Sequence, residues 1–138
     1  MPTWPSWIVK PHELPLEPLD KPSPEITRVC AGCRDDRGLE SEIDILDLTH
    51  SRYLTIVDID KDRNIVNVES IKNVFSTIPR KTALIVAYWI VESGVSIVIA
   101  SGYCHNMTYY LDQSGVVRLT ATGGERLIDV LKKFNLIS

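Results

Sequence analysis

The sequence has no excess of positive charge. Lys and Arg number 15 against 18 Asp and Glu, which gives a net charge of -3 and an isoelectric point of about 5.6. Proteins that bind the phosphate backbone of nucleic acids or an anionic lipid surface depend on such an excess. We therefore expect neither a nucleic acid nor a membrane among the partners of this chain.

Cysteine is also scarce. The three cysteines, Cys30, Cys33 and Cys104, cannot all pair within one chain, so they form a poor disulfide framework. The first residues contain no basic stretch followed by an apolar run, which is the pattern of a secretory signal. Together these absences favour a reducing, cytoplasmic location.

No uninterrupted apolar run is long enough to cross a membrane. Residues 83–100 are mostly apolar, but Glu92-Ser93-Gly94 interrupts them, whereas a membrane span needs about 20 apolar residues. A buried helix, a glycine stop and a buried strand account for this stretch.

Common signatures of catalysis are missing as well. The sequence contains no serine nucleophile elbow and no Walker-type phosphate loop. The first expected strand offers Thr27, Val29 and Ala31 where a two-metal nuclease would need carboxylates. We therefore expect a protein that is not an enzyme.

The length and composition of the chain are those of one globular domain. The chain has 138 residues, of which 44% are hydrophobic and 24% charged, as in globular proteins. Seven of its eight prolines lie between Pro2 and Pro24, which excludes a regular helix or a central strand there. We expect a proline-rich arm over residues 1–24 and a single α/β domain over residues 25–138. The arm could be a loose tail, or it could lie along the domain surface or along a partner in a homo-oligomer.

Hydrophobic periodicity predicts eight elements in the order βββαβαβα after the arm. The expected strands cover residues 25–31, 53–59, 64–71, 95–100 and 116–120, and the expected helices cover residues 80–93, 105–113 and 123–135. Thr122-Gly123-Gly124-Glu125 predicts a capping box at the start of the last helix. The order indicates a three-layer α/β fold, in which helices cover a mixed sheet of about five strands.

The expected parallel strands define an edge where a ligand could bind. If the first, fourth and fifth strands are parallel, their C-terminal ends meet there, and the edge carries residues 30–37, 101–105 and 121–124. Ser101-Gly102 and Gly123-Gly124 each precede an expected helix, so their backbone amides could bind a phosphate or a cluster sulfide. Ordinary turns and helix caps are the alternative explanation.

Four residues at this edge are candidate metal ligands. The spacing of Cys30 and Cys33 allows two thiolates to face one metal ion or cluster. Cys104-His105, from the neighbouring strand end, would complete a set of three sulfurs and one imidazole, which suits zinc or an iron-sulfur cluster. Two alternatives stay open: separate reduced thiols, and a redox dithiol formed by Cys30 and Cys33.

Four stretches of the chain resemble a known family. They are Gly38-Leu39-Glu40-Ser41-Glu42-Ile43, the strand at residues 53–58, the stretch at residues 94–102, and Thr122-Gly123-Gly124. In this order and spacing, over about residues 26–134, they resemble the dinitrogenase iron-molybdenum cofactor biosynthesis domain family. The resemblance implies a ribonuclease H-like motif fold and a non-catalytic protein that binds or carries an iron-sulfur or iron-molybdenum cluster or its precursor. It also implies a partner that donates or accepts the metallocluster.

The sequence departs from this family at one place. Where the family commonly has a His-Phe-Gly-Arg stretch before its second strand, this chain has Asp47-Leu48-Thr49-His50. The histidine is missing at the matching position, and His50, three residues further on, becomes a candidate for cofactor binding. Two rival functions remain: an interaction module that forms oligomers through the arm without a metal, and a small thiol oxidoreductase that uses Cys30 and Cys33.

Overall fold

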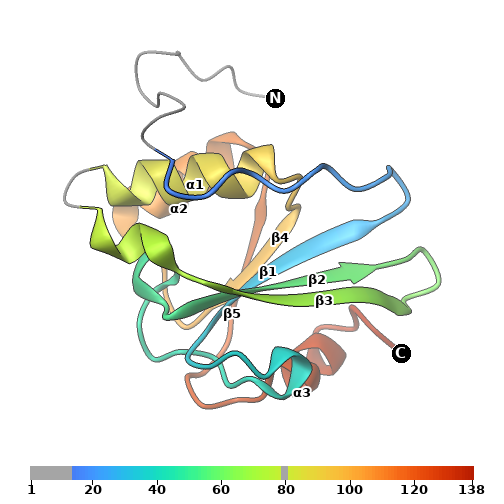
Figure 1. The fold of residues 1–138 in the computed structure, drawn as a ribbon. Coiled ribbons are helices and arrows are strands. Elements are labelled where there is room, and N and C mark those ends of the chain that lie inside the picture. The colour runs from blue at the N-terminus through green and yellow to red at the C-terminus, as the bar shows by residue number, and fades with distance from the viewer. Residues whose placement is uncertain (1–13, 79–80) are drawn as a thin grey trace.

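A computed structural model describes residues 14–78 and 81–138 (Figure 1), so most of the proline-rich arm lies outside the described residues. The strands are β1 (Thr27–Cys33), β2 (Tyr53–Ile59), β3 (Ile65–Lys72), β4 (Ile97–Ala100) and β5 (Val117–Thr120). The α-helices are α1 (Thr82–Glu92), α2 (His105–Gln113) and α3 (Leu127–Lys133), and the 3-10 helices are η2 (Gly38–Glu40), η3 (Leu48–His50) and η4 (Val74–Thr77). The predicted element order is confirmed.

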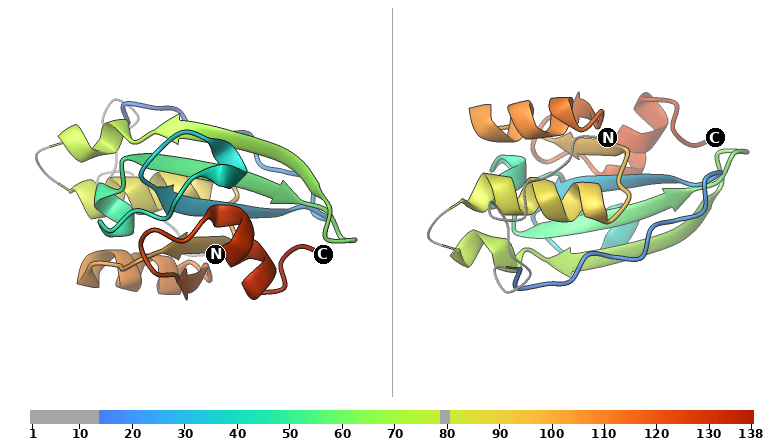
Figure 2. Two further views of the ribbon diagram at one scale, coloured as in Figure 1. Left: turned by 90° about the horizontal axis from the view of Figure 1, so that it is seen from below. Right: turned by 90° about the horizontal axis from the view of Figure 1, so that it is seen from above.

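The five strands form one sheet in the order β3-β2-β1-β4-β5. Strand β1 is parallel to β4, and β4 is parallel to β5, whereas β2 is antiparallel to both of its neighbours. Helices α1 and α2 cover one face of the sheet, and α3 covers the other (Figure 2). The predicted three-layer fold is therefore confirmed, and its strand order and directions are those of the ribonuclease H-like motif.

Side chains of β1 alternate between two hydrophobic cores, because successive residues of a strand point to opposite faces of the sheet. Cys30 packs in the core beneath α1 and α2, whereas Val29, Ala31 and Cys33 pack in the core beneath α3. Both faces of the strand are buried, which explains its nearly continuous apolar sequence. Within the described ranges, no helix is long and apolar enough to cross a membrane.

Strand β1 continues two residues beyond its expected end. The segment that follows η2 folds back and pairs with it: Cys33 forms a bridge with Ile43, and the Arg34 amide donates to the Glu42 carbonyl at 3.0 Å. These partners come from later in the chain, so the local sequence gives no sign of them.

Helix α3 begins at Leu127, four residues after its expected start. The Thr122 amide donates to the Glu125 carboxylate at 2.7 Å, and the Glu125 amide donates to the Thr122 carbonyl at 3.1 Å. The Thr122 amide and Lys133 hold the pKa of the Glu125 carboxyl below its usual range. The hydrogen bond that a capping box requires, from the Thr122 amide to the Glu125 side chain, is therefore present. It closes a turn before α3, however, and does not cap the helix itself.

The described part of the arm lies across α1. Leu14, Leu16 and Leu19 pack against the core on this side. The Trp89 indole donates to the Glu17 carbonyl at 3.0 Å, and the Leu19 amide donates to the Ser93 hydroxyl at 3.0 Å. From Leu14 onward, the arm thus follows the surface of its own domain.

Deleting residues 1–24 is expected to lower the free energy of unfolding by about 3 kcal/mol, because three partly buried leucines and the partner of Trp89 are lost. Urea denaturation measures the change, and deletion of residues 1–13, which leaves these contacts in place, is the control. Sizing chromatography tests the oligomer hypothesis. If the full-length protein forms an oligomer that dissociates when the arm is deleted, the arm also contacts a second chain. That result would contradict an arm that packs only on its own domain.

Candidate ligand-binding edge of the sheet

A single segment, residues 42–50, crosses the C-terminal ends of the parallel strands. The Asp44 amide donates to the Gly32 carbonyl at 3.0 Å in β1. The Leu48 amide donates to the Gly102 carbonyl at 3.0 Å after β4, and the Gly124 amide donates to the Ile43 carbonyl at 2.8 Å after β5. The residues expected to share one edge are therefore joined by this segment.

The glycines and the serine predicted to bind a ligand make contacts with the crossing segment. The amide of Gly124 already has the Ile43 carbonyl as its acceptor. A side chain at Gly123 would place a Cβ 2.7 Å from Cγ2 of Ile45, so glycine allows the two chains to pack closely. Ser101 donates its hydroxyl to the Leu46 carbonyl at 3.2 Å. In this structure, these residues hold the segment in place.

Cys30 and Cys33 do not share a pocket. Both are fully buried, and they belong to the cores on opposite faces of the sheet. Three residues of extended strand span about 10 Å, whereas the Cα atoms of a disulfide lie within about 7 Å. The expected convergence of Cys30 and Cys33 with Cys104 and His105 is not found: residues 14–78 and 81–138 contain no group of three or more His, Cys, Asp or Glu side chains that could hold a metal ion.

Burial also keeps both thiols protonated. It raises the pKa of Cys33 to about 11 and raises that of Cys30 well above its usual range, with a smaller contribution from Cys33. Since the thiolate is the form that binds metals and attacks disulfides, neither side chain is suited to these roles at neutral pH. The geometry and the protonation both oppose a redox dithiol.

The structure places Cys104 next to the turn that carries His50. Cys104 is the half-buried residue at the start of α2, and its Sγ lies 3.8 Å from Oγ1 of Thr49 in η3. His105 follows it and is exposed. The half-buried thiol at this edge is therefore that of Cys104, and the exposed imidazoles on the two elements that meet here are those of His50 and His105.

His50 is held in one orientation by Asp47. Nδ1 of His50 lies 2.8 Å from Oδ1 of Asp47, and the same oxygen accepts the His50 amide at 3.0 Å. A carboxylate at Nδ1 favours the tautomer that leaves the lone pair of Nε2 free, as in many metal sites. The His50 side chain is mostly exposed, so this nitrogen can reach a ligand from solvent.

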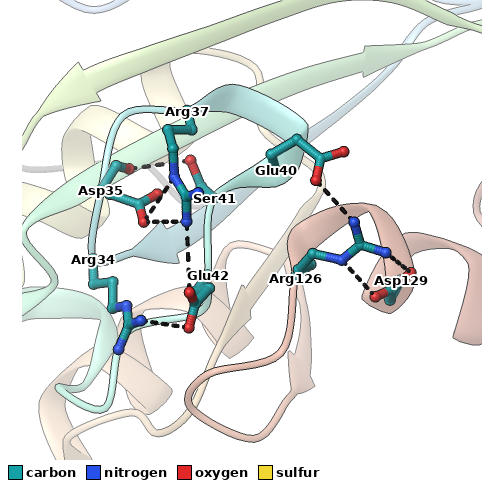
Figure 3. A network of polar contacts seen from close by, with 8 residues as sticks. All are labelled: Arg34, Asp35, Arg37, Glu40, Ser41, Glu42, Arg126 and Asp129. Carbon is teal, nitrogen blue, oxygen red and sulfur yellow. Dashed lines mark hydrogen bonds and ion pairs between the residues drawn. The ribbon is translucent and has the colours of Figure 1, made fainter.

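A network of charged side chains borders the edge and joins η2 to α3 (Figure 3). Arg126 binds Glu40 at 2.8 Å and Asp129 at 3.0 Å. Nearby, Arg34 binds Glu42 at 2.6 Å, and the same carboxylate lies 3.5 Å from Arg37. The contact between Arg126 and Glu40 joins segments that are 86 residues apart in sequence, so the local sequence gives no sign of it. The other ion pairs join residues that are close in the chain.

Comparisons with known proteins agree with this fold. A family model described as dinitrogenase iron-molybdenum cofactor matches residues 40–136, while a search of curated proteins finds no match. The crystal structure of PH0822 has 28% sequence identity and a TM-score of 0.62, over 78% of this chain and 89% of that one.

Two further solved structures are similar in fold. The apo form of the orange protein from Desulfovibrio gigas has 14% identity and a TM-score of 0.66, over 79% of this chain and 87% of that one. A protein of the DUF35 family from Thermotoga (TM1290), described as a NifB protein, has 22% identity and a TM-score of 0.61, over 79% of this chain and 87% of that one.

Proposed function

The chain belongs to the dinitrogenase iron-molybdenum cofactor family, and from this premise we propose that it binds and carries an iron-sulfur or iron-molybdenum cluster, or its precursor, without catalysing a reaction. The observation that supports this function in the chain itself is the contact between Cys104 and the turn that carries His50. A thiolate and an imidazole are ligands that suit iron-sulfur chemistry.

The ligand set fits a cargo better than a permanent cofactor. A closed structural site surrounds its metal with four protein ligands, and the described residues contain no group of even three. Cys104, with the imidazole of His50 or of His105, would supply only some of the ligands of a cluster that brings its own sulfides. A zinc ion without sulfides requires more ligands from the protein, so these residues suit it less well.

The surroundings of the edge support transfer to a second protein. Ile45 is 72% exposed and Leu46 is 38% exposed, and both belong to the segment that crosses the strand ends. Exposed aliphatic side chains of this size favour contact with a protein partner. We propose that this partner donates or accepts the metallocluster, so that the cluster passes between the two proteins beside Ile45.

Anaerobic reconstitution with iron and sulfide tests the carrier function. The wild-type protein is expected to gain the absorption of a bound cluster and bound iron, whereas Cys104→Ser loses both. Asp47→Asn, which disturbs the orientation of His50, is expected to weaken binding by about 10- to 100-fold. Cys33→Ala serves as the matched control and keeps the cluster. A wild-type protein without bound metal, or a Cys104→Ser protein that binds like the wild type, would refute the proposal.

A further inference from the structure

A cavity of about 250 Å³ lies at the end of the sheet opposite the candidate edge. It is formed by the β2–β3 turn, the starts of β1 and β4, and the chain that follows α3. Figure 2 shows the β2–β3 turn and the C-terminal end of the chain at the same end of the molecule. Ile59, Ile97 and Leu136 supply apolar surface to the cavity, and Lys61 and Arg63 supply two cationic side chains.

Arg63 differs from the other arginines of the described chain. Each of the others forms an ion pair with a carboxylate, whereas the guanidinium of Arg63 donates to the backbone carbonyl of Asn135 at 3.3 Å. A guanidinium has five N–H donors, so most of those of Arg63 stay available. Lys61 likewise forms no ion pair within the described residues.

The backbone of Arg63 is in an unfavourable conformation for its residue type. Its φ of 65° lies in the left-handed region, where a hairpin turn is most stable with glycine or asparagine. Asn135, on the facing wall of the cavity, also has a positive φ, of 58°. A residue that weakens its own turn while it lines a cavity indicates that its side chain has a function.

The acidic residues of the same turn do not cancel these cations by pairing with them. Asp60 also lines the cavity, but its Oδ1 accepts the amides of Asp62 and Asn64, both at 2.9 Å. Asp62 is exposed and is not part of the lining. The cavity therefore combines an apolar floor with two cations that pair with no carboxylate among residues 14–78 and 81–138.

We propose that this cavity binds a small phosphate monoester that carries an apolar group. A phosphate monoester has a charge close to -2 at neutral pH, which matches Lys61 and Arg63, and a guanidinium binds phosphate oxygens with good geometry. The apolar group of the ligand would lie against Ile59, Ile97 and Leu136. This site is separate from the proposed cluster site and does not depend on it.

Nuclear magnetic resonance titration of the full chain tests the site, with phenyl phosphate as the probe. Phenyl phosphate is expected to cause saturable shifts of the amide signals of Thr27, Ile97 and Leu136. Phenol and benzoate, titrated separately, are expected to cause none, because the first lacks the charge and the second carries a single one. No saturable shift with phenyl phosphate, shifts located elsewhere, or equal binding of benzoate would overturn the proposal.

Arg63→Gly separates a binding role from a structural one. The glycine suits the left-handed turn, so the melting temperature should stay the same or rise, while the affinity for phenyl phosphate should fall by about 10-fold or more. Lys132→Ala, in the exposed last turn of α3, is the control and should leave the affinity unchanged. An Arg63→Gly protein that binds phenyl phosphate as the wild type does would overturn the proposal.

Discussion

Replacing Asp58 by alanine is expected to lower the free energy of unfolding by about 3–5 kcal/mol, because the change leaves the charge of Arg28 buried without its partner. The guanidinium of Arg28 binds both oxygens of Asp58, at 2.8 and 3.1 Å. The two side chains are only 10% and 8% exposed. Solvent therefore cannot replace the lost carboxylate.

The consequences of this change extend beyond the sheet. Arg28 also donates to the carbonyls of Asp20, in the arm, and Ser93, at the end of α1, both at 2.7 Å. Since Asp58 fixes the position of the guanidinium, its loss should loosen the arm and the end of α1 together. Hydrogen exchange of the amides of Leu19 and Ser93 should therefore accelerate in the variant.

Asp112→Ala is the matched control for urea denaturation. Asp112 binds Arg118 with the same two-bond geometry, at 2.8 and 3.1 Å, but this pair is exposed, so its loss should cost about 1 kcal/mol or less. The double variant Arg28→Met with Asp58→Leu should recover much of the lost stability, because no buried charge remains. If Asp58→Ala and Asp112→Ala lower the free energy of unfolding equally, the buried pair contributes no more to stability than the exposed one, which would contradict the prediction.

Most of the fold could be predicted because its signals are local. The helix at residues 105–113 and the strand at residues 53–59 were predicted with the bounds that the structure shows. Short apolar runs between turn residues gave the remaining elements, and the right-handed crossover rule gave the parallel strands. Long-range pairing set the boundaries that were missed, as in β1, whose last residues bind the segment after η2.

The candidate site was only partly predictable for the same reason. Two cysteines separated by two residues can face one metal ion when they lie in a loop, but in an extended strand the same spacing sends their side chains to opposite faces. The extension of β1 to Cys33 decides between these outcomes, and it depends on a tertiary contact with Ile43. The ion pair of Arg28 with Asp58, and the hydrogen bond that Arg63 makes to the Asn135 carbonyl, likewise have no local sign.

Above pH 9, the free energy of unfolding is expected to fall steeply as the pH rises, because the folded state keeps protons that the unfolded state releases. Burial raises the pKa of Cys33 from 9.0 to about 11, and it raises the pKa of Cys30 further. The stabilisation from these neutral thiols is complete below pH 9. It decreases by about 1.4 kcal/mol per pH unit for each thiol between pH 9 and 11, or by about 5 kcal/mol for both across this window.

Urea denaturation under reducing conditions between pH 7 and 11 measures this dependence. Cys33→Ala removes one of the two thiols and should reduce the slope between pH 9 and 10 by about half. Above pH 10 Tyr103, whose pKa is also raised by burial, adds to the slope in both proteins. Val29→Ala, which truncates a buried side chain on the same face of β1, should lower the stability without changing the slope. A stability that stays constant from pH 9 to 11 would contradict the protonated state of these thiols.

The same protonation should control how the cysteines react. At pH 8, iodoacetamide is expected to label Cys30 and Cys33 at least 1000-fold more slowly in the native protein than in urea, because they are fully buried and alkylation requires an exposed thiolate. Mass spectrometry of labelled peptides measures both rates. A redox dithiol would have to react in the native state, so rapid native labelling of either residue would revive that alternative. Slow labelling would leave Cys104 as the thiol available to a cluster.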